Sequence, residues 1–228
     1  MTLFVWLAVV VVVALAIFFA VRTVVRPWIY DVAIVRMTTT WYREVLSRVP
    51  RGARVLDVGI GTGAALIANA DLMLEKGLVV TGVDYDADYV HSCAAAVHQA
   101  KLDAAVAVHN VSVYDFRGGP YDAVYFSGSL MLMPDATAAL RHCASLLAPG
   151  GKIYSTQTFE ETRNVPLELL KPWLKWLTTI DFGRVTYEHE VLGAFKAANL
   201  RLICNAAFGD SKSKQRSYHI IVAEPAEV

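Results

Sequence analysis

The sequence has 228 residues, 55% of them hydrophobic, with 21 basic (Lys and Arg) and 21 acidic residues. This length fits one α/β domain of about 200 residues together with a short additional segment. Because the formal net charge is zero, no overall electrostatic field favours a polyanion, and we expect no nucleic-acid partner.

The N-terminal segment is the most apolar part of the chain. Residues 3–21 contain no charged side chain, and a helix of this length reaches about 28 Å, close to the thickness of a bilayer core. Arg22 can extend toward the lipid headgroups, so the apolar span continues to residue 25. The sequence therefore predicts a transmembrane anchor, residues 1–29, that contacts the lipid bilayer through residues 3–25.

Two other interpretations of this segment stay open, a buried helix of a soluble protein and a cleaved signal peptide. A signal peptide usually begins with basic residues, whereas only Met1 and Thr2 precede the apolar run. Arginines follow the segment instead, at positions 22, 26 and 36. By the positive-inside rule we expect a single-pass membrane protein whose larger domain, residues 30–228, faces the cytoplasm or the equivalent side of an organelle membrane.

An amphipathic helix is predicted next. Pro27 interrupts the helical pattern, and between residues 30 and 49 the apolar side chains of Trp41, Val45 and Leu46 recur at helical spacing. We expect this helix to hold the domain close to the bilayer.

Beyond residue 52, apolar runs of strand type alternate with helical stretches, which is typical of a mostly parallel sheet with helices on both faces. Strands are predicted near residues 53–58, 78–84, 104–110, 121–127, 152–158, 200–208 and 217–224. Residues 160–187 interrupt the alternation, and such an excursion is where a substrate lid is expected.

The first of these strands runs into a glycine-rich turn, in the sequence RVLDVGIGTG from Arg54 to Gly63. Glycine is needed where the backbone turns tightly and approaches a ligand without a Cβ in the way. A helix predicted over residues 64–76 directs its free N–H groups at the same place. The turn is a candidate cofactor-binding loop, although a plain tight turn is the alternative.

The second predicted strand ends at Asp84, about 25 residues beyond Gly59. A carboxylate at this place can accept hydrogen bonds from both hydroxyls of a ribose. The other role open to Asp84 is to cap the next helix, and Asp86 suits that role better. We therefore predict that Asp84 binds a ribose.

Four segments, VLDVGIGTG, the strand ending in VDY, YDAVYFSGSL and LLAPGGKIY, resemble the successive motifs of class I S-adenosylmethionine-dependent methyltransferases. The resemblance covers residues 50–159, and the last two predicted strands are similar to the hairpin that closes the sheet of that family. It implies S-adenosylmethionine as cofactor and an α/β fold with a Rossmann-like, seven-stranded, mostly parallel sheet and an antiparallel C-terminal hairpin. In this chain one N-terminal transmembrane helix would precede that fold.

The resemblance also assigns cofactor-binding residues, which are Asp57, Gly59, Gly61, Gly63, Asp84, Tyr85, Asn110 and Val111. Asp57 is expected to hold the amino group of the methionine part, and Tyr85 to contact adenine. Where the family often has an Asp that accepts from the adenine amino group, this chain has Asn110, whose amide oxygen can still accept that hydrogen bond. The backbone N–H of Val111 is expected to reach the ring.

The acceptor side carries weaker signals. Methyl transfer needs a base only if the nucleophile arrives protonated, and the sequence singles out no catalytic residue and no metal ligands. Ser127 and Ser129 lie at the carboxyl end of the fourth predicted strand, where a substrate crevice is expected, although turn or cap roles are the alternative. In the predicted lid, Trp173 and Trp176 either line the acceptor pocket or pack in the core.

Together these features predict a membrane-anchored enzyme that methylates a small lipophilic molecule, such as a quinone precursor, a thiol or a lipid headgroup. The Asn/Asp-Pro-Pro-Tyr tetrad of resembling enzymes that methylate DNA or glutamine is absent after the fourth predicted strand, which disfavours those substrates. Two alternatives stay open. The chain could methylate a side chain of a membrane-protein partner, or it could be a subunit of methyltransferase fold, with lost activity, that serves in the assembly of a membrane complex.

Overall fold

The computed structural model describes residues 5–7, 9–10, 12–13, 35–160, 186–209 and 216–226. Within this part of the chain, no helix is long and apolar enough to cross a membrane. Most of the predicted anchor, and the part of the predicted lid that holds Trp173 and Trp176, lie outside the described residues. The anchor, the lid and the boundary between residues 29 and 30 therefore stay predictions.

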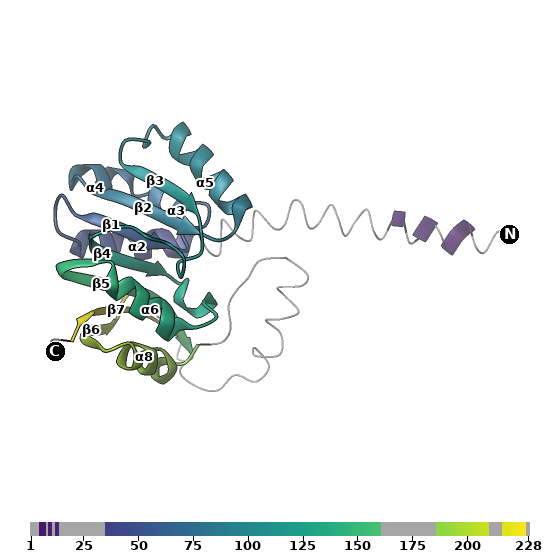
Figure 1. Ribbon diagram of the computed structural model, residues 1–228. Helices are drawn as coiled ribbons and strands as arrows, with labels where there is room; N and C mark the ends of the chain where they lie inside the picture. Colours follow the sequence, from purple (N-terminus) through teal and green to yellow (C-terminus); the bar gives the residue numbers. More distant parts are fainter. Residues whose placement is uncertain are drawn as a thin grey trace.

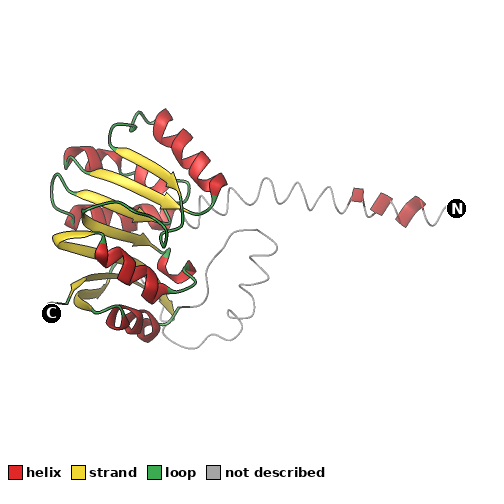
Figure 2. Ribbon diagram, in the orientation of Figure 1, coloured by secondary structure: helices red, strands yellow, loops and turns green. Residues whose placement is uncertain are grey.

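A seven-stranded sheet forms the centre of the domain, and helices cover both of its faces (Figures 1 and 2). The strands are β1 (Arg54–Val58), β2 (Val79–Asp84), β3 (Val106–Asn110), β4 (Tyr121–Ser127), β5 (Leu147–Glu160), β6 (Leu200–Ala207) and β7 (Arg216–Pro225). Their order in the sheet is β3-β2-β1-β4-β5-β7-β6, and of these strands β7 alone runs opposite to the others. The predicted Rossmann-like sheet with an antiparallel C-terminal hairpin is confirmed.

The helices pack on the sheet in two layers. They are α2 (Arg36–Arg48), α3 (Ala64–Ile67), α4 (Ala70–Glu75), α5 (Ala87–Gln99), α6 (Ala136–Ser145) and α8 (Glu188–Ala197). On one face, α2 to α5 bury apolar side chains such as Leu46, Leu66 and Met73 against the sheet. On the other face, α6 and α8 do so with Leu140 and Phe195. The alternation of strands and helices thus produces two separate apolar layers.

The amphipathic helix predicted before the first strand is α2, and its apolar face lies in the core. Trp41, Val45 and Leu46 are buried, and the rings of Trp41 and Tyr218 lie 5.7 Å apart. Because this face is covered by the domain, it is not available to a bilayer, and α2 could hold the domain near a membrane only through the segment before it, which stays a prediction.

The helix predicted over residues 64–76 is broken in two. Asn69 has a non-helical backbone (φ −115°, ψ 21°), and its buried side-chain amide donates to the carbonyl of Ala65 in α3 and to that of Thr39 in α2. This side chain competes with the backbone for hydrogen bonds, as Asn does at helix ends. Since α3 is only one turn long, its dipole contributes less at the glycine loop than a long helix would.

Candidate active site

The carboxyl ends of four parallel strands meet at one edge of the sheet. Val58 of β1 pairs with Val83 of β2, and Asp84 pairs with Asn110 of β3. On its other side, β1 pairs with β4, so the strand order reverses between them. Ligands bind in the crevice that such a reversal opens at the carboxyl ends of the strands.

The glycine loop connects β1 to α3 at this edge. Gly59, Gly61 and Gly63 all have a positive φ, between +59° and +75°. A Cβ on Gly59 would lie 2.7 Å from the Cβ of Ser129, and a Cβ on Gly63 would lie 2.5 Å from the Sγ of Cys93. The loop therefore requires glycine both for its backbone conformation and for its close packing.

Asp84 at the end of β2 contacts this loop directly. Its Oδ2 accepts from the N–H of Gly61 and its Oδ1 from the N–H of Asp86, both at 3.0 Å. Burial raises the pKa of Asp84, and these two hydrogen bonds oppose that rise. An ionised carboxylate has about four acceptor positions, so acceptors remain for two ribose hydroxyls.

Asp86, which follows Asp84, caps α5 as predicted. Its side chain accepts from the N–H groups of Asp88 and Tyr89. The two neighbouring aspartates therefore have different roles, since the carboxylate of Asp84 alone is directed at the glycine loop.

Asp57 on β1 is a buried carboxylate with one partner, and only 1% of it is exposed. The hydroxyl of Tyr42 in α2 donates to Oδ2 at 2.6 Å, while Oδ1 has no hydrogen-bond partner in the described part of the chain. Burial raises the pKa of Asp57 to about 7. The hydrogen bond from Tyr42 lowers this pKa, and the charge of Asp84 raises it. A buried acceptor without a donor is costly, and an ammonium group would satisfy it.

Asn110 holds the end of β2 in place. Its side-chain Nδ2 donates to the backbone carbonyls of Asp84 and Tyr85, at 3.1 and 3.0 Å. An Asp at this position could not donate these bonds, so the departure from the family pattern has a structural purpose. With the nitrogen used in this way, the amide oxygen is the group that could accept from an adenine amino group.

The two remaining predicted adenine contacts differ from each other. Tyr85 is 78% exposed at this edge, so a planar ring can stack on it. The backbone N–H of Val111, by contrast, donates to the carbonyl of Asp84 at 2.9 Å. It is engaged in the extension of the β2–β3 pairing and is not free to reach the adenine ring, which corrects the expected contact.

Ser127 and Ser129 have separate surroundings at the end of β4. Ser129 is buried, donates its hydroxyl to the carbonyl of Val58 and packs against Gly59, so it supports the glycine loop rather than the predicted acceptor site. Ser127 is the last residue of β4, two residues beyond Tyr125. The hydroxyl of Tyr125 makes a hydrogen bond of 2.9 Å with that of Thr156 in β5.

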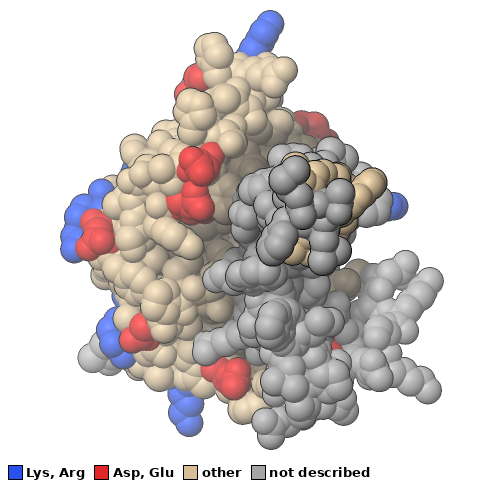
Figure 3. Space-filling model, turned by 90° about the vertical axis from the view of Figure 1, so that its right-hand side faces the viewer, with Lys and Arg blue, Asp and Glu red and all other residues tan. Residues whose placement is uncertain are grey.

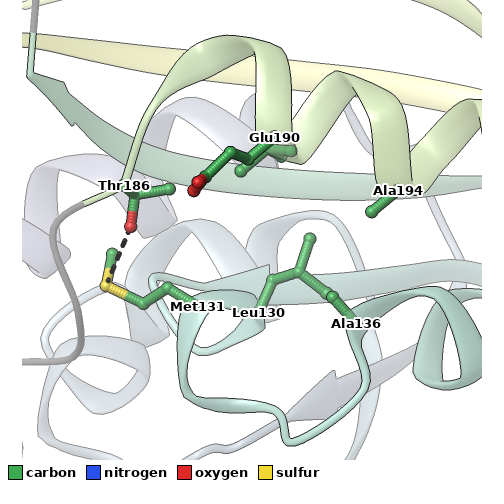
Figure 4. A pocket seen from close by; sticks show the side chains of 7 residues that line it. Leu130, Met131, Ala136, Thr186, Glu190 and Ala194 are labelled. Atoms are coloured by element: carbon green, nitrogen blue, oxygen red, sulfur yellow. Dashed lines mark hydrogen bonds between the residues drawn. The ribbon is translucent and has the colours of Figure 1, made fainter.

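A small cavity of about 40 Å³ lies between the short 3-10 helix Leu130–Leu132 and α8 (Figure 4). Its lining residues are Leu130, Met131, Ala136, Thr186, Glu190, Val191 and Ala194. The hydroxyl of Thr186 lies 3.8 Å from the sulfur of Met131, and Figure 4 shows the carboxylate of Glu190 pointing toward both. Ser129, which precedes the lining residue Leu130 in the chain, packs against Gly59 of the glycine loop.

Reasoning from the sequence missed Tyr42 and the cavity residues of α8. Tyr42 follows Trp41 on the buried face of a predicted helix, and a hydroxyl on an apolar face is the signal that could have marked it. Glu190 lies about 60 residues from Met131 along the chain and carries no motif. Only the fold brings these two side chains to one cavity.

Residues 55–151 match a protein family described as "Methyltransferase domain". The chain is 39% identical over 108 residues to a "Ubiquinone biosynthesis O-methyltransferase" of Xanthomonas axonopodis pv. citri, which is 46% of this chain and 43% of that protein. This chain thus matches less than half the length of that relative.

Solved structures share the fold over a larger part of the chain. The mitomycin 7-O-methyltransferase MmcR has a TM-score of 0.67 at 15% identity and is matched over 92% of this chain and 60% of its own. A geranyl diphosphate methyltransferase in complex with S-adenosylmethionine has a TM-score of 0.64 at 13% identity and is matched over 82% of this chain and 85% of its own. At these identities, the likeness shows the fold alone. The family match over residues 55–151 and this likeness of fold together show a methyltransferase domain on a Rossmann-like sheet.

Proposed function

We propose that this chain transfers a methyl group from S-adenosylmethionine to a small lipophilic acceptor at the edge formed by β1, β2 and β4. The observation that carries this proposal is the buried Oδ1 of Asp57, which has no partner in the described chain and lies beside the glycine loop and Asp84. An ammonium group and a ribose are the two groups that this pair of carboxylates would bind, and the cofactor contains both.

The residues of the edge can hold each part of the cofactor. Asp57 would accept from the methionine ammonium, Asp84 from the ribose hydroxyls, and the amide oxygen of Asn110 from the adenine amino group. Tyr85 would stack on the adenine ring. When bound, S-adenosylmethionine supplies an electrophilic methyl group on a sulfonium, so the task of the chain is to position the acceptor and to exclude water.

The acceptor would meet the cofactor beside the cavity beneath α8, which at about 40 Å³ is itself too small to hold an aromatic ring. This cavity has mostly apolar walls and one carboxylate, that of Glu190, which can accept the proton of an acceptor hydroxyl. On the face of the molecule that Figure 3 shows, uncharged side chains make up most of the described surface, and Lys and Arg lie only near its outline. Such a surface favours a neutral acceptor over a polyanion.

The similarity to ubiquinone biosynthesis O-methyltransferases supports a hydroxyl on a lipophilic ring as the methylated group. Of the predicted acceptor residues, Ser127 is the serine that could contact such a ring, because Ser129 is used inside the domain. Trp173 and Trp176 remain proposed acceptor contacts on the strength of their sequence pattern.

The membrane attachment is proposed from the N-terminal segment. Residues 3–21 contain no charged side chain, and a helix of this length reaches about 28 Å, close to the thickness of a bilayer core. In addition, only residues 49–53 connect the end of α2 to the start of β1, so α2 begins toward the other, carboxyl end of that strand. An anchor over residues 3–25 would therefore join the domain beside the active site, on the cytoplasmic or equivalent side.

The test is methyl transfer by the full chain reconstituted in lipid vesicles, with radiolabelled S-adenosylmethionine. We expect a catechol with a prenyl tail to be methylated with a lower KM than the same catechol without the tail, because the tail partitions into the bilayer. As a control, the chain without residues 1–29 should lose this preference and remain in the soluble fraction. Equal KM values for the two catechols with the full chain would exclude the proposed membrane delivery.

A subunit with lost activity is the second candidate function. Two sequence features favour it, Asn110 and the absence of the Asn/Asp-Pro-Pro-Tyr tetrad. The hydrogen bonds of Asn110 to the end of β2 give the first of these a structural reason instead. Binding of S-adenosylhomocysteine without methyl transfer to phenols, catechols, thiols or membrane proteins would favour this candidate over the enzyme.

A further inference from the structure

We propose that Tyr42 is a positioning residue for the cofactor. Its hydroxyl fixes the Asp57 carboxylate so that Oδ1 faces the methionine ammonium, and it thereby makes α2 part of the cofactor site. This inference rests on the proposed function, because it assumes a cofactor that carries an ammonium group. It concerns a residue outside the stretch 55–151 that matches the methyltransferase family.

The packing around Tyr42 directs its hydroxyl at the carboxylate of Asp57. The ring is buried and meets the ring of Tyr125 edge to face, with centroids 4.9 Å apart and an angle of 83° between the planes. Held in this way, the hydroxyl donates to Oδ2 of Asp57 at 2.6 Å. Since one carboxylate oxygen is occupied, Oδ1 is the oxygen left for a ligand.

Helix α2 is itself fixed to the domain at both ends. Near its start, the carbonyl of Thr39 accepts from the side chain of Asn69. At its end, the ammonium group of Lys76 donates to the carbonyls of Leu46 and Ser47, which a helix terminus leaves without internal partners. The Tyr42 hydroxyl is therefore held in register with β1 by contacts that do not involve the cofactor.

The charges around Asp57 make this hydrogen bond important. The groups that face it are Tyr42 from α2, Tyr125 from β4, Asp84 from β2 and Cys93 from α5. Among the described groups that act on the pKa of Asp57, none is basic, and the Tyr42 hydroxyl is the one that lowers it. The hydroxyl thus favours the ionised carboxylate that an ammonium ligand requires.

A pH dependence follows from this arrangement. Because burial raises the pKa of Asp57 to about 7, the carboxylate becomes ionised as pH rises through neutrality. Affinity for a ligand with an ammonium group should rise over the same range. Loss of the Tyr42 hydroxyl would raise this pKa further and shift the rise in affinity to higher pH.

The experiment compares Tyr42→Phe with Tyr125→Phe, which removes a hydroxyl from the same buried face but from a bond to Thr156. The full chain in detergent micelles is titrated by calorimetry between pH 6 and pH 8.5. The two ligands are S-adenosylhomocysteine and methylthioadenosine, which has the adenosine part but no ammonium. For Tyr42→Phe at pH 7 we expect about tenfold weaker binding of S-adenosylhomocysteine, as for loss of a hydrogen bond to a charged group. Its pH profile should move upward, while methylthioadenosine binding stays at the wild-type value. Tyr125→Phe keeps the hydrogen bond from Tyr42 to Asp57, so it should change the affinity and the pH profile much less than Tyr42→Phe.

Two further variants keep the test decisive. In an Asp57→Asn background, Tyr42→Phe should no longer change the affinity for S-adenosylhomocysteine, because the group through which it acts is gone. Tyr42→3-fluorotyrosine, which keeps the shape of the ring and donates more strongly, should move the pH profile downward, and it covers the case in which Tyr42→Phe does not fold.

The contradicting results are equally distinct. An unchanged pH profile in both Tyr42 variants, or an equal loss of methylthioadenosine binding, would overturn the positioning role. If the wild-type chain binds methylthioadenosine but not S-adenosylhomocysteine, the inference fails. If the wild-type chain binds neither ligand, the proposed function fails as well.

Discussion

The two halves of the active-site edge are built differently. On the side of β1 to β3, buried or half-buried polar groups from separate elements converge, with Tyr42, Asp57 and Asp84 held by specific hydrogen bonds. On the side of β4 and α8, a cavity of about 40 Å³ has mostly apolar walls and the single carboxylate of Glu190. A charged cofactor with several hydroxyl and amino groups requires fixed polar partners, whereas a lipophilic acceptor requires mainly shape.

The largest effect is expected in the glycine loop. Gly59→Ala should weaken S-adenosylhomocysteine binding by about 100-fold or more and destabilise the domain, because the new Cβ would lie 2.7 Å from that of Ser129. Gly52→Ala is the matched control, since Gly52 also has a positive φ but has nothing within 4 Å of its Cβ position. Calorimetry and thermal unfolding would measure both, and equal behaviour of the two variants would show that packing against Ser129 is irrelevant.

A smaller effect is expected at the end of β2. Asp84→Ala should weaken cofactor binding by about 2 kcal/mol or more, because the ribose hydroxyls would lose the charged group that accepts their hydrogen bonds. Asp86→Ala should instead lower the free energy of unfolding by about 1 kcal/mol through loss of the α5 cap, with cofactor affinity unchanged. Tight binding by Asp84→Ala would refute the ribose assignment.

The buried Asp57 should affect the pH dependence of the free energy of unfolding as well as cofactor binding. Its pKa in the folded chain is raised to about 7, so the stability associated with the protonated carboxyl is present at low pH and is lost as pH rises toward neutrality. Asp57→Asn has no such loss. Without ligand, the free energy of unfolding of the variant should therefore rise relative to that of the wild type, by up to about 1.4 kcal/mol per pH unit between roughly pH 4 and pH 7.

Urea unfolding of both proteins at pH 5 and pH 8 would measure this difference, and the variant should bind S-adenosylhomocysteine more weakly. A stability difference that is the same at both pH values would mean that Asp57 titrates normally.

The smallest effect on the cofactor is expected from the acceptor half. Ala194→Leu should fill the cavity beneath α8 and raise the KM for the acceptor several-fold, with cofactor affinity unchanged. Steady-state kinetics with a prenylated catechol, beside calorimetry with S-adenosylhomocysteine, would separate the two halves. A parallel loss of both affinities would show that the halves are not independent.

The sequence predicted the sheet well, and also the position of the glycine loop and Asp84 at its edge, because both depend on local patterns. Alternating strands and helices, the three glycines and Asp84 lie within short stretches whose geometry follows from residue type. The break at Asn69 was missed, since it depends on a hydrogen bond to Thr39 in another helix.

Contacts between distant segments account for the other misses. The Tyr42–Asp57 pair and the cavity residues Met131 and Glu190 join segments that are far apart in the sequence. In the sequence, Asn110 is only a departure from the pattern of the resembling family. In the fold, it donates to two backbone carbonyls at the end of β2, which no local pattern predicts.

The most direct test of the account is an experimental structure of the chain with S-adenosylhomocysteine bound. We predict that its ammonium nitrogen lies within about 3 Å of Oδ1 of Asp57 and that both ribose hydroxyls donate to Asp84, with Tyr42 still bonded to Oδ2. A ligand bound elsewhere, or one whose ammonium group points away from Asp57, would contradict the central claim.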